Sequence, residues 1–112
     1  KFADLAAANG MDGSAPYVGE SYDAAAIIAL AIQAGGSADR QSILNNISKV
    51  SNAPGIVINP GQLAYGLQML AAGKDIDYQG ATDVEFNVFG DAAGAFKELE
   101  VSGGTFVTVG AL

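Results

Sequence analysis

The chain has 112 residues, within the range of a single domain, and half of them are hydrophobic, so it can bury a modest core. Twelve acidic residues against five basic ones give a net charge of −7, which argues against binding to nucleic acid or to an anionic membrane surface. Cysteine and histidine are both absent, which excludes disulfides, thiolate chemistry and a serine–histidine triad within this chain. The longest apolar run, Ala24 to Ile32, has nine residues, whereas a membrane helix needs about 20.

Residues 1–9 predict a first helix, ended by Asn9-Gly10. The chain starts in this helical sequence with neither an initiator methionine nor a signal peptide. We therefore expect a piece of a longer protein or its mature C-terminal portion. A native small domain with a processed start is the alternative.

A second helix is predicted over 21–35, with Ser21 as its N-cap and Asp23 in the first turn, where the helix dipole favours negative charge. Residues 22–34 are apolar almost all round, so we expect this helix to be buried on every side. Gly35-Gly36 ends it.

A third helix, over 37–50, is capped by Ser37 and is amphipathic, because its apolar residues recur at helical spacing. The short apolar run 56–58 is compatible with a strand. A fourth helix is predicted over 62–73, where Gly73 stops it.

Three strands are predicted towards the C-terminus, over 83–88, 95–101 and 104–109, because polar and apolar residues alternate there between glycine-containing turns. Strands with so little apolar surface cannot form a domain by themselves. We expect them to be the closing edge of something larger. Helices followed by strands predict an α/β fold class.

Four residues, Asp83, Glu85, Asn87 and Asp91, superficially suggest a calcium loop. The sixth position of that loop requires glycine and the twelfth a bidentate glutamate, and this sequence has valine and glycine there. The solvated face of a strand explains the acidic residues better, and no metal site is predicted.

Catalytic motifs are also weak. The segment 90–94 lacks the lysine of a phosphate loop and the spacing of a dinucleotide-binding motif, so it is interpreted as a turn. Glu98 and Glu100 share one strand face, but they alternate with Leu99 and Val101 and have no apolar surroundings that would tune them for catalysis. We therefore predict neither an enzyme nor a cofactor.

Four stretches carry a resemblance to a known family. They are Pro16-Tyr17-Val18 running into Ser21 to Ala26, then Ala34 to Leu44, then Tyr78 to Asn87 followed by Gly90-Asp91, and finally Gly104 to Val109. In this order they resemble the C-terminal portion of type I periplasmic solute-binding proteins, in the branched-chain amino acid (Leu/Ile/Val) branch that serves ABC importers. Asp83 and Asn87 depart from it, standing where glycine and aspartate are frequent, and 56–72 holds an extra helix-like stretch.

The resemblance implies a two-lobe α/β binding protein that closes on an amino acid or a related small solute, with this chain as its C-terminal part. It implies a periplasmic or otherwise extracytoplasmic location, with a signal and a lipid anchor in the precursor, and ABC-transporter membrane subunits as partners. Within this chain it points to Tyr17, Gly19 and Glu20 as ligand-binding residues. Gly19 would leave a roomy pocket, and Glu20 would bind a polar or cationic ligand or else only complement the helix dipole.

Two other functions stay open. One is a ligand-sensing regulatory domain of the same fold, which a secretory signal in the precursor would argue against. The other is a structural or interaction domain that forms oligomers through the apolar helix from Tyr22 to Ala34. If the chain is a piece of a larger fold, we expect it to self-associate in isolation, because cutting such a fold exposes apolar surface.

Overall fold

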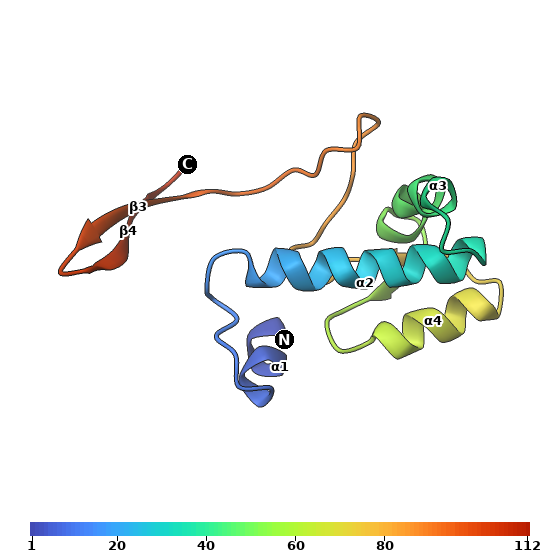
Figure 1. Cartoon of the computed structure of the whole chain (residues 1–112), viewed down its shortest axis with the longest axis horizontal. Helices are drawn as coiled ribbons and strands as arrows, with labels where there is room; N and C mark the ends of the chain where they lie inside the picture. Colours follow the sequence, from blue (N-terminus) through green and yellow to red (C-terminus); the bar gives the residue numbers. More distant parts are fainter.

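The computed structural model describes residues 1–112 and has a mixed α/β fold, with a helical body and a β-hairpin on an extended arm (Figure 1). Its elements in chain order are α1 Phe2–Ala8, α2 Val18–Gly35, α3 Arg40–Ser51, β1 Ile56–Ile58, α4 Leu63–Ala71, β2 Ile76–Tyr78, β3 Lys97–Ser102 and β4 Thr105–Ala111. No helix combines the length and the apolar character needed to span a bilayer.

The centre of the body is a βαβ unit. Strands β1 and β2 run parallel, with Ile56 beside Ile76 and Ile58 beside Tyr78. Helix α4 forms the crossover between them, as a parallel connection requires. The long helix α2 crosses the body, with α3 and α4 packed beside it (Figure 1).

The core is small, because only 15 of the 112 residues are buried. It joins α2 and α3 to the two parallel strands through Leu30, Val50, Ile58, Ile76 and Tyr78, among others. Gly66 of α4 allows close packing here, since a Cβ atom at this position would lie 3.1 Å from the Leu30 side chain and 3.4 Å from Ile58. The body is therefore held by one cluster that depends on small residues at the helix contacts.

Helix α2 begins three residues earlier than predicted, and Ser21 is not its N-cap. The Ser21 N–H donates to the carbonyl of Tyr17 at 2.9 Å, which places Ser21 inside the first turn. Tyr17 precedes the helix in a left-handed conformation, with φ of 63°, and it contributes no side-chain cap. The helix starts directly after the turn at residues 16–17. Ser21 was predicted as the N-cap because serine is common at that position, but here it lies inside the first turn.

The expectation that α2 is buried on every side is also wrong. Its buried residues repeat at helical spacing along one face, which includes Asp23, Ala26, Ile27, Leu30 and Ala31. The opposite face has no neighbouring layer, and Ile28 on that face is 46% exposed. Apolar composition all round the helix therefore does not mean that partners exist on all sides.

The other helix ends shift by a few residues. The capping of α3 comes from Asp39, whose carboxylate accepts from the Gln41 N–H at 3.2 Å, and not from the predicted Ser37. Ser37 instead accepts from the Asp39 N–H at 3.0 Å, so it lies in the turn before the helix. The first and fourth helices are each shorter than predicted by one residue or two at each end, which is within normal fraying.

The strand predicted over 83–88 is wrong. This stretch forms turns, and its only strand-like pairing is a single bridge between Phe86 and Ala92. The side-chain amide of Asn52 takes the place of a partner strand, because it accepts from the Phe86 N–H at 2.9 Å and donates to the Phe86 carbonyl at 2.7 Å. An alternating pattern thus occurs here without a neighbouring strand to pair with.

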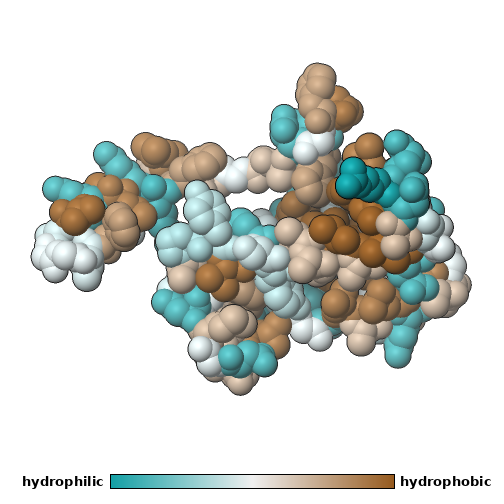
Figure 2. Space-filling view, in the orientation of Figure 1, coloured by the Kyte–Doolittle hydropathy of each residue, from teal (hydrophilic) through white to brown (hydrophobic).

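The two terminal strands exist, displaced by one or two residues from the predicted 95–101 and 104–109. They pair antiparallel, with Leu99 opposite Thr108 and Val101 opposite Phe106. Nearly every residue of the hairpin is exposed, including Phe106 at 72%. Figure 2 shows hydrophobic residues along this arm. A two-stranded hairpin with an uncovered apolar face is only marginally stable on its own.

Candidate functional site

The start of α2 is fixed to the turn after β2 by one carboxylate. Asp23 is 3% exposed. Its Oδ1 accepts hydrogen bonds from the Tyr78 hydroxyl and the Ala81 N–H, both at 2.8 Å. Its Oδ2 accepts from the Thr82 N–H at 2.8 Å and the Thr82 hydroxyl at 2.6 Å. With four donors around it, Asp23 has a structural role and joins segments more than 50 residues apart in sequence.

Gly80 completes this network. It has φ of +63°, and a Cβ atom there would collide with the Asp23 carboxylate and the Tyr78 ring. A side chain would therefore push the turn away from α2. The sequence from Tyr78 to Thr82 thus forms one rigid turn at the carboxyl end of β2.

The buried hydroxyl of Tyr78 is expected to make the body less stable at alkaline pH. Burial raises the pKa of its hydroxyl far above the usual value, and the hydrogen bond to Asp23 and the charge of Asp23 add to the shift. An unfolded tyrosine loses its proton near about pH 10, whereas Tyr78 in the folded state keeps its proton above that pH. The contribution of Tyr78 to the free energy of unfolding is therefore fully present below about pH 10. It decreases above that pH, by at most about 1.4 kcal/mol per pH unit.

Urea unfolding between about pH 8 and 12 measures this dependence. Tyr78→Phe is expected to remove its part of the slope. Tyr65→Phe, a change at a partly exposed tyrosine of α4, is expected to keep it. An identical slope in wild type and Tyr78→Phe would show that the buried hydroxyl is not its source.

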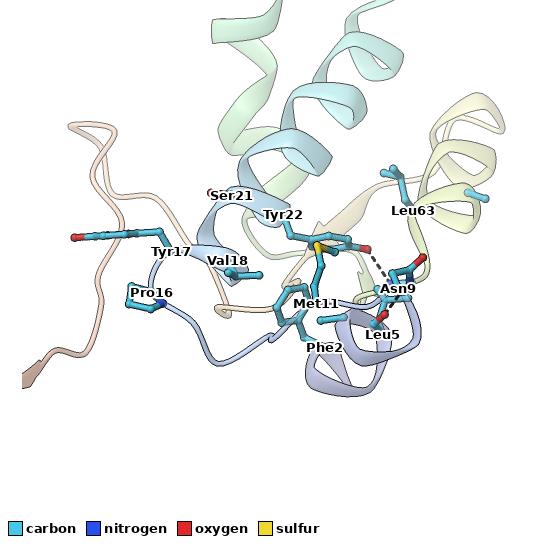
Figure 3. A pocket seen from close by; sticks show the side chains of 13 residues that line it. Phe2, Leu5, Asn9, Met11, Pro16, Tyr17, Val18, Ser21, Tyr22 and Leu63 are labelled. Carbon is cyan, nitrogen blue, oxygen red and sulfur yellow. Dashed lines mark hydrogen bonds between the residues drawn. The ribbon is translucent and has the colours of Figure 1, made fainter. Parts of the chain in front are cut away.

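A cavity of about 710 Å³ opens between α1, the loop after it, the start of α2 and the start of α4. Its walls are mainly apolar and include Phe2, Leu5, Met11, Tyr22 and Leu63, shown in Figure 3. The rings of Phe2 and Tyr22 are tilted by 53°, with centroids 5.2 Å apart. None of the residues that line the cavity is charged.

Few polar groups reach this cavity, and some of them already have partners. The Tyr22 hydroxyl accepts from the Gly61 N–H at 2.9 Å. The Asn9 side-chain amide donates to the Leu5 carbonyl at 2.9 Å. The Tyr22 hydroxyl keeps its own proton for a further acceptor, since a phenol both accepts and donates. The cavity therefore suits an apolar occupant with one polar atom.

The three residues pointed out by the family resemblance do not converge on one site. Tyr17 lies at the edge of the cavity but is 76% exposed, and its ring points away from Phe2, Met11 and Tyr22 (Figure 3). Gly19 is buried, where a Cβ atom would lie 3.4 Å from Ala81 and 3.5 Å from Thr82.

Glu20 is exposed in the first turn of α2 and does not line the cavity. Tyr17 and Glu20 are therefore both exposed near the start of α2, while Gly19 is buried against the turn that Asp23 holds. The cavity residues Phe2, Met11 and Leu63 were missed, because single apolar residues in three separate segments carry no signal of a shared wall.

No three or more of the acidic residues lie together in a group that could hold a metal ion. No model of a protein family, no curated protein and no solved structure matches this chain.

Proposed function

We propose that this chain is the C-terminal portion of a two-lobe, type I periplasmic solute-binding protein that delivers an amino acid or a related small solute to an ABC importer. The observation that supports the proposal most is the Asp23 network. It joins Ser21 to Ala26 and Tyr78 to Thr82, two of the stretches that resemble this family, into one structural unit. Two family-like motifs that are hydrogen-bonded to each other support the resemblance more than either motif alone.

The proposed contribution to binding is the exposed surface of Tyr17 and Glu20. The Tyr17 ring projects from the body and offers an apolar face to an aliphatic side chain. Glu20 accepts hydrogen bonds from the ammonium group of an amino acid. Residues outside this chain then bind the carboxylate of the ligand, because no lysine or arginine lies beside either residue in the sequence.

Hinge closure is the proposed mechanism. The ligand binds the closed arrangement of the two lobes more tightly, and so it shifts the population toward the form that the membrane subunits recognise. The exposed hairpin β3–β4 and the exposed residues 93–96 before it are in place to reach a second lobe, since they extend away from the body (Figure 1). No covalent chemistry is required.

A melting-temperature screen of the two-lobe protein tests this proposal. Leucine, isoleucine or valine is expected to raise the melting temperature, because a ligand that binds only the folded state stabilises it. Tyr17→Ala is expected to abolish the rise, and Tyr65→Ala, at another exposed tyrosine, is expected to preserve it. No rise with any amino acid, or a rise unaffected by Tyr17→Ala, would contradict the proposal.

A structural or interaction domain is the second candidate, favoured by the uncovered apolar faces of the hairpin and of α2. It predicts a molecular mass that increases with protein concentration and shows no response to solutes. A sensing domain of the same fold would bind the same class of solute but deliver the signal to a regulatory partner.

A further inference from the structure

The cavity between α1, α2 and α4 shares only one residue, Tyr17, with the proposed solute surface. Tyr17 touches its edge, but the ring of Tyr17 points outward, and Gly19 and Glu20 are not among its walls. Its volume of about 710 Å³ is in the range of pockets that hold small organic molecules. A ligand there would contact three segments of the chain at once.

The residues that line the cavity indicate whether its ligand is charged or uncharged. The chain carries a net charge of −7, yet none of its twelve acidic residues and none of its five basic residues lines the cavity. An ion or a zwitterion would gain no charged partner from these walls, and wherever it packs against them it would lose hydration without compensation. An uncharged ligand has no such cost.

The side chains also indicate its shape. Phe2 and Tyr22 present two tilted rings, an arrangement that accepts a third ring edge to face. Met11 lies beside these two rings and adds a flexible thioether that adapts to irregular ligands (Figure 3). The Tyr22 hydroxyl, fixed by the Gly61 N–H at 2.9 Å, has a proton to donate to one acceptor.

We propose that this cavity binds an uncharged, ring-containing small molecule, whose ring packs against the apolar wall formed by Phe2, Tyr22 and Leu63. The site does not depend on the proposed transport function. It selects against amino acids, because nothing in its walls compensates an ammonium or a carboxylate group. A protein with both sites would bind a neutral ring compound in the cavity and a charged solute at the Tyr17–Glu20 surface, each independently of the other.

Indole tests the proposal, with tryptophan as its matched control, since tryptophan carries the same ring and adds a zwitterion. Titration of the isotope-labelled 112-residue chain by NMR is expected to give saturable shifts at the amides of Phe2, Met11, Tyr22 and Leu63. Tryptophan at the same concentrations is expected to leave these amides unchanged.

Two alanines of α4 provide the variants. Ala64 lines the cavity and is exposed, so Ala64→Phe adds a ring at the cavity wall without disturbing the core. It is expected to weaken indole binding about tenfold or more. Ala71→Phe is the control, because Ala71 is exposed at the far end of the same helix and does not line the cavity. This variant is expected to bind indole as the wild type does.

Three results would overturn the proposal. In the first, indole shifts no cavity amide, or shifts them equally in Ala64→Phe. In the second, tryptophan binds as tightly as indole. In the third, the wild type is a dimer that Ala64→Phe dissociates while neither protein binds indole, which would make a second copy of this chain the occupant.

Discussion

Replacement of Asp23 by alanine is expected to lower the free energy of unfolding by about 4 kcal/mol, because it removes the acceptor of four hydrogen bonds inside the protein. The Tyr78 hydroxyl and the donors of Ala81 and Thr82 would then lie without a partner near the core. A domain of this size has about 5–15 kcal/mol in total, so the variant would be partly unfolded at physiological temperature. Urea unfolding followed by circular dichroism measures the loss.

Two further variants define the cause. Asp23→Asn keeps the shape of the side chain but offers one acceptor oxygen in place of two, so we expect an intermediate loss. Glu20→Gln changes an exposed carboxylate one turn earlier in the same helix and is expected to cost no more than about 0.5 kcal/mol. A loss below about 1 kcal/mol in Asp23→Ala would contradict the role given to this network.

Gly55→Ala is expected to be nearly as damaging. Gly55 has φ of +151°, a conformation that side chains rarely adopt, and a Cβ atom there would lie 2.7 Å from both the Cα and the carbonyl oxygen of Ile76. The main chain of Ile76 cannot move without breaking the register of β1 and β2. We expect a loss of about 3 kcal/mol or more in thermal or urea unfolding.

Amide hydrogen exchange locates that damage. The Ile56 N–H, which donates to the Asp75 carbonyl at 2.9 Å, is expected to lose protection in Gly55→Ala. Gly61→Ala is the control, since Gly61 also has positive φ, +84°, but a Cβ atom there would meet only the Leu5 side chain at 3.9 Å. It is expected to cost about 1 kcal/mol from backbone strain alone. Equal losses in the two variants would show that crowding against Ile76 is unimportant.

Helices were predictable from this sequence because their signals are local. Apolar spacing and terminal glycines placed the ends of all four within about three residues, and the starts of α2 and α3 deviated most. Strands depend on partners, which a pattern does not show. Residues 83–88 alternate but form no strand, and there Asn52 binds the main chain of Phe86. Strand β2 was missed because Asp75 and Asp77 interrupt its apolar character.

The candidate site was less predictable for the same reason. The resemblance singled out Tyr17 and Glu20, which the structure leaves exposed, and Gly19, which it buries. The Asp23 network needs Tyr78 and Thr82 to meet a helix 55 and 59 residues away in sequence. The apolar cavity has no sequence signal, since its walls are ordinary hydrophobic residues of separate elements.

Small-angle X-ray scattering of the two-lobe protein tests the proposed function most directly, because it detects hinge closure itself. The measurement compares the protein without ligand to the protein in a saturating mixture of leucine, isoleucine and valine. Closure predicts a smaller radius of gyration in the mixture, and Tyr17→Ala should reduce the change. An unchanged radius of gyration in the wild type would contradict a solute-binding protein of this class.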